Sequence, residues 1–151
     1  MKFKKNKGFT VIELLVVIGL IAVLVGALIF LINPVAQLQR SRDARRKADL
    51  RQIQSALELY RSDQLTYPTP ASVLNCGSSL QGTVNGNLIT YITKIPCDPK
   101  TGASYIYVPA SPTSPASSYT IMACLENAND PDKTSPNSCP SSYYSYTLQS
   151  P

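Results

Sequence analysis

One acidic side chain lies inside a long apolar stretch near the start of the chain. Residues 9–32 form a run of 24 residues in which Glu13 carries the only charge. A carboxylate at the centre of a bilayer costs about 2.5–3.5 kcal/mol on insertion scales, and less near an interface. Glu13 is one turn into the run, so lipid can tolerate it, whereas a water-free bundle of helices would require a cationic partner. The acid therefore predicts such a partner or, more simply, a favourable interaction with the positive end of the helix dipole.

The residues needed for enzymatic chemistry are missing from the sequence. The chain has no histidine, no nucleophile motif and no paired carboxylates in an apolar setting. Asp98 lies between Pro96 and Pro99, where it is predicted to form a turn rather than to act as an acid catalyst. We expect a protein that is not an enzyme. A binding protein that uses the apolar run as a membrane tether is kept as a less favoured alternative.

All four cysteines lie beyond residue 75, at Cys76, Cys97, Cys124 and Cys139. They form no CxxC pair, and without histidine a metal site is improbable. Residues 63–151 contain few large aliphatic side chains, so their core is small, and disulfides usually supplement such a core in an oxidising compartment. We therefore expect the C-terminal part outside the cytoplasm. Four cysteines permit three pairings, of which short loop closure favours Cys76 with Cys97 and Cys124 with Cys139.

The net charge of +5 is unevenly distributed along the chain. Four lysines precede the apolar run, residues 40–51 contain six basic and two acidic side chains, and residues 52–151 contain four basic and six acidic ones. We expect no nucleic-acid binding, because it would require a basic C-terminal part. The cluster at residues 40–51 is predicted to be a solvated helix face or, alternatively, a surface that attracts anionic lipid. Pairs at i,i+4 spacing, Asp43 with Lys47 and Arg45 with Asp49, are expected on that helix.

Two helical segments with different surfaces are expected before residue 63. Residues 9–32 are long enough to cross a bilayer and too long for an ordinary secretory signal. Pro34 is predicted to interrupt the helix, because proline removes a backbone hydrogen bond. Residues 33–62 are rich in strong helix formers and should form a stalk helix with a narrow apolar stripe. The stripe consists of Leu50, Ile53, Ala56, Leu57 and Tyr60.

The remaining residues, 63–151, are expected to form a small β-rich head. Short runs rich in Tyr, Ile, Val and Thr alternate with turns rich in Pro, Gly and Ser, which is typical of a small antiparallel sheet. One face of the sheet would pack on the apolar stripe of the stalk helix, giving an α+β fold. The candidate strands are residues 88–92, 105–108, 119–125 and 143–148.

Two motifs carry a resemblance to a known family. Residues 7–15, KGFTVIELL, resemble the class III leader and mature N-terminus of type IV pilins and type II secretion pseudopilins. That pattern has a short basic leader, a glycine, a phenylalanine that becomes methylated, and a glutamate four residues later. A second segment, residues 95–107, contains Ile-Pro-x-Asp-Pro-x-x-Gly and is similar to a loop and strand of major pseudopilins.

The resemblance implies processing followed by assembly. A membrane-bound prepilin peptidase would remove the basic leader, residues 1–8, by cutting between Gly8 and Phe9, and would methylate the new amine of Phe9. Residues 9–32 would anchor the subunit in inner-membrane lipid and then, with an assembly platform, pack into the core of a helical homopolymer. There Glu13 would pair with the Phe9 amine of a neighbouring subunit and fix the axial register. The product would be a filament outside the cytoplasm.

The resemblance leaves the type of filament open. We slightly favour a major pilin of a type IV pilus, with a major pseudopilin of a type II secretion system as the alternative. In either filament the basic stem at residues 40–51 would face a neighbouring subunit or the outer surface, with Asp43 and Asp49 of adjacent subunits as counter-charges.

Major pseudopilins often bind calcium in a loop near their C-terminal strands. The corresponding residues here supply oxygen ligands without a recognised spacing. A disulfide between Cys124 and Cys139 would close the same loop without a metal. No cofactor is therefore expected, and calcium is kept only as a weak alternative. Its candidate ligands are Glu126, Asn129, Asp130 and Asp132.

Overall fold

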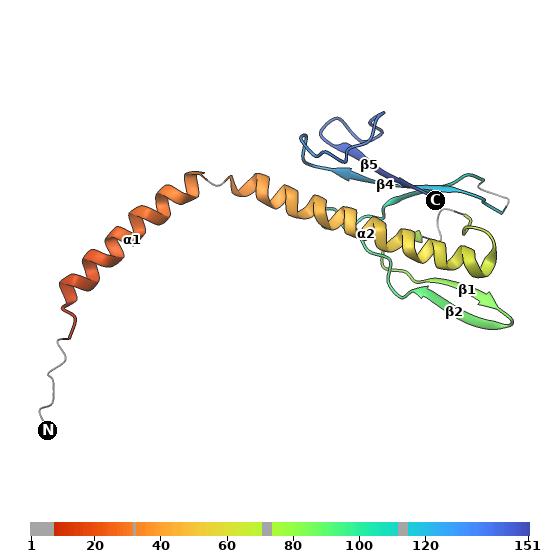
Figure 1. The fold of residues 1–151 in the computed structure, drawn as a ribbon, viewed down its shortest axis with the longest axis horizontal. Helices are drawn as coiled ribbons and strands as arrows, with labels where there is room; N and C mark the ends of the chain where they lie inside the picture. The colour runs from red at the N-terminus through yellow and green to blue at the C-terminus, as the bar shows by residue number, and fades with distance from the viewer. Residues whose placement is uncertain (1–7, 32, 71–73, 112–114) are drawn as a thin grey trace, which may run out of the picture. The chain divides into compact units, whose positions relative to one another are not determined.

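The computed structural model describes residues 8–31, 33–70, 74–111 and 115–151. Its contacts divide the chain into two units, Met1–Gln37 and Leu38–Pro151, and each is described by itself. The helices are α1 (Val11–Leu31) and α2 (Pro34–Gln64). The strands, all in the second unit (Figure 1), are β1 (Leu80–Val84), β2 (Asn87–Ile92), β3 (Ile106–Pro109), β4 (Tyr119–Leu125) and β5 (Tyr144–Gln149).

The start of α2 follows from the pair Asn33-Pro34. Pro34 is the first residue of the helix, where its missing N–H would have had no intrahelical acceptor. The side-chain oxygen of Asn33 accepts a hydrogen bond from the backbone N–H of Ala36 at 3.2 Å and so caps the helix. α1 ends at Leu31, and the second helix begins at this pair.

One face of α2 is buried from Asp43 to Leu57, and the chemistry of that face changes along the helix. The second half buries the expected apolar stripe, with Leu50, Ile53 and Leu57 no more than 3% exposed. Tyr60, the last member of the stripe, is half-buried and packs against the core. The first half continues the same face with charged side chains, which the sequence did not predict to be buried. These are Asp43, Arg46 and Asp49.

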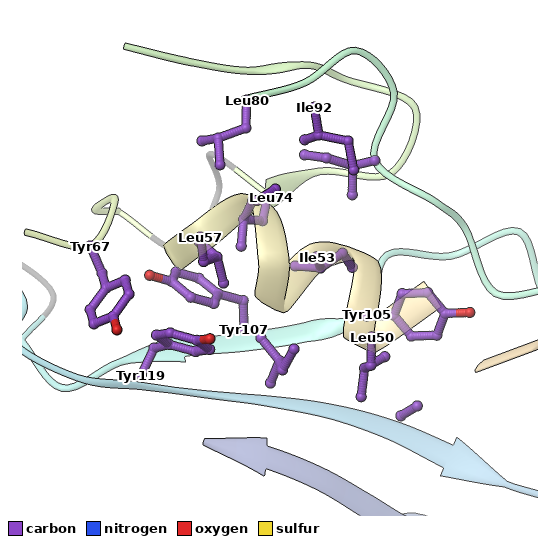
Figure 2. Close-up of a cluster of buried hydrophobic side chains, with 14 of the residues drawn as sticks. Leu50, Ile53, Leu57, Tyr67, Leu74, Leu80, Ile92, Tyr105, Tyr107 and Tyr119 are labelled. Carbon is purple, nitrogen blue, oxygen red and sulfur yellow. The ribbon is translucent and has the colours of Figure 1, made fainter. Parts of the chain in front are cut away.

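The apolar half of α2 lies between two layers of the second unit. Figure 2 shows Leu80 and Ile92 on one side of the helix and Tyr107 and Tyr119 on the other. Leu57 of α2 points into this core and is fully buried. The helix thus completes a core that the short strands could not form alone.

The strands form two antiparallel sheets, where the sequence predicts one. β1 pairs with β2, and a separate sheet has the order β3-β4-β5. β4 is the central strand and alternates fully buried with partly buried residues, as expected for a strand with one face on the core. The α+β class is confirmed, and the division into two sheets lets both cover α2.

The strand that the sequence analysis missed, β1, has few of the usual strand-forming residues. Its hairpin with β2 is closed by the two-residue turn Asn85-Gly86, with φ of 50° and 81°. A type I′ turn requires positive φ at both positions, and Asn-Gly is its strongest sequence signal. That dipeptide is the signal that could have revealed β1.

Candidate functional site

The N-terminus of α1 is closed by a capping box formed by Thr10 and Glu13. The backbone N–H and the hydroxyl of Thr10 each donate to Oε2 of Glu13 at 2.8 Å. In return, the backbone N–H of Glu13 donates to the Thr10 hydroxyl at 3.3 Å. This reciprocal arrangement satisfies helix donors that otherwise lack a partner. Within a single chain, the carboxylate therefore stabilises the start of the helix.

The Glu13 carboxylate also keeps a free side. Both bonds from Thr10 converge on Oε2, and Oε1 accepts no hydrogen bond from any described residue. A shallow apolar depression runs beside it, lined by Phe9, Ile12, Glu13, Val16 and Val17. A neighbouring helix laid in this depression could bring a donor to Oε1 without displacing Thr10.

The rest of α1 is apolar on every side and uncovered within its own unit. Residues 11–29 are long and apolar enough to cross a membrane, and none of them is buried. At about 1.5 Å per residue, the 21 residues of α1 span about 32 Å, close to the thickness of a bilayer core. A helix that is apolar all round has to be covered by lipid or by other apolar helices.

The predicted processing site lies just before α1. Gly8 and Phe9 precede the helix, and Phe9 is 88% exposed. No neighbouring atom lies within 4 Å of the position that a side chain on Gly8 would occupy. The leader before Gly8, residues 1–7, lies outside the described residues.

A cluster of charged side chains, absent from the sequence-based site, joins α2 to the head. We call it the ion-pair cluster, and its members are Arg42, Asp43, Arg46, Asp98, Lys100 and Glu126. Arg46 is its centre. The Arg46 guanidinium, 1% exposed, lies 2.8 Å from Asp43, 2.6 Å from Asp98 and 2.9 Å from Glu126.

The surrounding bonds satisfy the remaining groups of this cluster. Arg42 binds both carboxylate oxygens of Glu126 at 2.7 Å, the bidentate geometry that guanidinium groups favour. Asp43 accepts hydrogen bonds from the backbone N–H groups of Glu126 and Asn127, which fixes the end of β4 against the helix. Among the described residues, no buried side-chain nitrogen or oxygen lacks a partner.

These contacts overturn the expectations for the basic stem. Asp43 pairs with Arg46, not with Lys47, and Asp49 accepts a hydrogen bond from the hydroxyl of Tyr105 at 2.7 Å instead of pairing with Arg45. The counter-charges of Arg42 and Arg46 lie within the same chain, so the acids of adjacent subunits are not required. Asp43 lies one helical turn from Arg46, but the other counter-charges, Asp98 and Glu126, lie more than 50 positions away, where local spacing cannot reveal them.

Asp98 has the turn-forming role expected for it and a second role as well. Its Oδ1 accepts hydrogen bonds from the backbone N–H groups of Lys100 and Thr101 at 2.9 and 2.8 Å, while its Oδ2 binds Arg46. Gly102, in the same turn, has a φ of +69°, a conformation that glycine adopts without strain. The Ile-Pro-x-Asp-Pro-x-x-Gly motif thus presents an acid to α2.

The ion-pair cluster should make stability depend on pH in the acid range. Hydrogen bonds from Arg42, opposed by burial and aided by Lys100 and Arg46, lower the pKa of Glu126 from its ordinary 4.5 to about 2. Burial alone would raise the pKa of Asp98, but bonds from Arg46, Thr101 and Lys100 outweigh it, so this pKa also lies well below its usual range.

The pKa values of Glu126 and Asp98 are both lowered in the folded state, so the free energy of unfolding decreases as the pH falls. The stabilisation is complete above about pH 5 and is lost as the pH falls from about 4.5 through 2, because the unfolded chain then binds more protons. We expect the free energy of unfolding in urea to fall by up to about 1.4 kcal/mol per pH unit for each carboxyl. A free energy that stays constant between pH 6 and pH 2 would contradict this.

Two disulfides secure the loops that supply the acids of the cluster. Cys76 is bonded to Cys97, which is next to Asp98. Cys124, two residues before Glu126, is bonded to Cys139. These are the pairs that short loop closure favours.

Removing one disulfide should destabilise the second unit measurably. Cys124 and Cys139 are 15 residues apart. Closing a loop of that length lowers the entropy of the unfolded chain, which stabilises the folded state by about 3 kcal/mol. We expect a Cys124→Ser, Cys139→Ser protein to lose roughly that much stability in urea denaturation. Equal stability of the double mutant and the wild type would show that the ion pairs alone hold this connection.

Three of the four residues proposed as calcium ligands are bound to cationic side chains instead. Both carboxylate oxygens of Glu126 are taken by Arg42, Arg46 and Lys100. The side chains of Asp130 and Asp132 both bind the ammonium group of Lys47. Across the part of the chain that the structure describes, no group of three or more His, Cys, Asp or Glu side chains is arranged to hold a metal. Cationic side chains thus neutralise the three carboxylates that calcium would need.

Comparison with known proteins identifies two successive parts of the chain. The prokaryotic N-terminal methylation motif matches residues 3–29, and the family model of type II secretion system protein G matches residues 33–133. The chain is 28% identical over 129 residues to type II secretion system core protein G of Pseudomonas aeruginosa, covering 82% of this chain and 87% of that protein. It is 31% identical over 110 residues to core protein G of Escherichia coli, covering 69% and 72%. No solved structure matches.

These matches reverse the preference between the two types of filament. The sequence motifs slightly favour a pilus pilin, whereas the family model and both relatives favour the secretion pseudopilin. Both relatives are core proteins of a secretion system, in agreement with the expectation that the chain is not an enzyme. With its methylation motif, its apolar N-terminal helix and its α+β head, the chain belongs to the type II secretion protein G family of pseudopilins.

Proposed function

We propose that this chain is a major pseudopilin that assembles, through α1, into a filament serving type II secretion. The observation that carries the proposal is the exposed surface of α1, which is apolar all round and has one acid at its start. Lipid covers such a helix before assembly, and the same helices of neighbouring copies cover it in a filament. Similarity to core protein G of two bacteria supports the secretion system over the pilus.

Processing supplies the charge that Glu13 needs in the filament. Cleavage between Gly8 and Phe9 creates a cationic amine, and methylation leaves it cationic. Oε1 of Glu13 has no partner among the described residues, so it can accept from the amine of a neighbouring subunit while Oε2 keeps its bonds to Thr10. A buried pair of this kind fixes the register between subunits more than it adds stability.

The proposal also assigns the compartments. The subunit is anchored in the inner membrane by residues 9–32, with the two disulfides and the head outside the cytoplasm. Its partners are the prepilin peptidase, an inner-membrane assembly platform and further copies of itself. The stalk helix and the head form the filament surface.

Two measurements test this function. Mass spectrometry of the natural protein should find an N-terminal methylated Phe9 and no residue of the leader. Deleting the chain should abolish secretion of folded exoproteins while surface pili remain, and adding it back should restore secretion. A natural product that still begins at Met1 would contradict the processing step, and loss of pili with intact secretion would favour a pilus pilin instead.

A further inference from the structure

The connection between β4 and β5 is long and depends on contacts from outside itself. It runs from Glu126 to Tyr143 without a strand, closed at one side by the Cys124–Cys139 disulfide. Its middle contains Asp130-Pro131-Asp132, in which Oδ1 of Asp130 accepts the backbone N–H of Asp132 at 2.9 Å. This turn places two carboxylates close together.

Lys47 of α2 supplies the positive charge between those carboxylates. Its Nζ donates to Oδ1 of Asp130 and, at 2.7 Å, to Oδ2 of Asp132. The ring of Tyr146 lies on a further side, with its centroid 5.6 Å from Nζ. The side chains of Lys47 and Asp130 are only 15% and 10% exposed, so water screens this contact weakly.

Without a cation this turn would be strained by repulsion. The side chain of Asp130 is 10% exposed and that of Asp132 is 53% exposed. Two carboxylates this close, one of them largely buried, destabilise each other unless a positive charge lies between them. A lysine ammonium is a compact point charge with three donors, which makes it able to bridge two acids much as a small ion does. Calcium would need six to eight oxygens, and here one oxygen of Asp130 and one of Asp132 are already bound to Lys47.

We propose that Lys47 is the built-in cation of the β4–β5 connection, holding Asp130 and Asp132 as a bound calcium ion would. The natural chain is therefore indifferent to calcium. Removing the ammonium leaves the two carboxylates free, and the connection then becomes responsive to calcium. This inference does not depend on the proposed function.

Thermal unfolding of the full chain in detergent tests the proposal. All nine tyrosines belong to the second unit, so their near-ultraviolet circular dichroism reports its unfolding alone. Wild-type Tm should be the same in excess EDTA and in millimolar CaCl₂. Lys47→Met keeps most of the side-chain stem and should lower Tm in EDTA by about 5 °C, and CaCl₂ should restore much of that loss in a saturable way.

Matched variants test whether the effect requires the ammonium group of Lys47 itself or only one lysine charge anywhere on the head. Lys94→Met removes an exposed lysine elsewhere on the head and should behave like the wild type in both solutions. Adding Asp132→Asn to Lys47→Met should abolish the response to calcium, because one of the two carboxylates is gone. If Lys47→Met does not fold, calorimetric titration of the wild type with CaCl₂ decides, and absence of binding heat supports the proposal.

Three results would overturn the proposal. Wild-type Tm that rises saturably with CaCl₂ would show that the natural chain binds the metal. An unchanged Tm of Lys47→Met in EDTA would show that the ammonium has no structural role. A lowered Tm that calcium does not raise would show that the ammonium does not occupy a cation position.

Discussion

Replacing Glu13 with glutamine is expected to abolish filament assembly while leaving α1 folded and inserted in the membrane. Glutamine serves in capping boxes as glutamate does, so the bonds from Thr10 can be kept. What is lost is the negative charge opposite the amine of Phe9. An unpaired charge in a dry bundle costs about 3–5 kcal/mol. Since about 1.4 kcal/mol is a factor of ten in affinity, subunit addition should weaken at least about a hundredfold.

The measurement compares sheared filaments and secreted protein in cells carrying each variant, with the membrane-inserted subunit as the internal reference. Thr10→Val is the matched control, because it removes the capping hydroxyl but keeps the charge of Glu13. We expect Thr10→Val to assemble nearly as well as the wild type. If Glu13→Gln assembles normally and Thr10→Val does not, the carboxylate acts only as a helix cap and the pairing with Phe9 is wrong.

Replacing Arg46 with methionine is expected to destabilise the second unit by about 3–5 kcal/mol. Arg46 is almost fully buried and contacts three carboxylates, on α2, in the Asp98 turn and at the end of β4. Methionine fills much of the space but leaves those acids without their central cation. Removing one partner of a buried ionic cluster costs this much because the remaining charges stay desolvated.

Urea denaturation at pH 7 measures the effect, and Arg45→Met is the control. Arg45 is the adjacent residue of the same helix and is exposed, so its replacement should change stability by less than about 0.5 kcal/mol. The acid dependence of stability should change as well, because the pKa of Glu126 and that of Asp98 would move toward their ordinary values in Arg46→Met. Equal stability of the two variants would show that Arg42 and Lys100 suffice to neutralise the cluster.

In the proposed function, the two sets of residues have separate tasks. α1 would carry the surface and the acid for assembly, while the ion-pair cluster and the disulfides stabilise the second unit, where α2 packs against the head. A variant of the cluster should therefore lower the amount of folded subunit without changing the cleavage at Gly8. Variants of Glu13 should instead leave the amount of folded subunit unchanged and impair assembly.

The sequence by itself determined the features that depend on local patterns. The apolar run and its single acid identify α1, the apolar spacing from Leu50 to Tyr60 identifies the buried face of α2, and Asn33-Pro34 marks the place between the two helices. Four of the five strands were predicted: β4 matches its predicted range, and β2, β3 and β5 lie within one residue of theirs. Each of these signals is read within a few turns of helix or one strand.

Only the tertiary structure decided where the charges of residues 40–51 go. Arg42, Arg46 and Lys47 were predicted to be solvated or to face other molecules. Apart from Asp43, one turn from Arg46, their partners lie 52 to 85 residues away in the same chain. Whether an arginine on a helix is exposed or buried depends on which loop folds over it, and helix spacing contains no information about that. For the same reason the calcium hypothesis could be tested only once Lys47 was seen between Asp130 and Asp132.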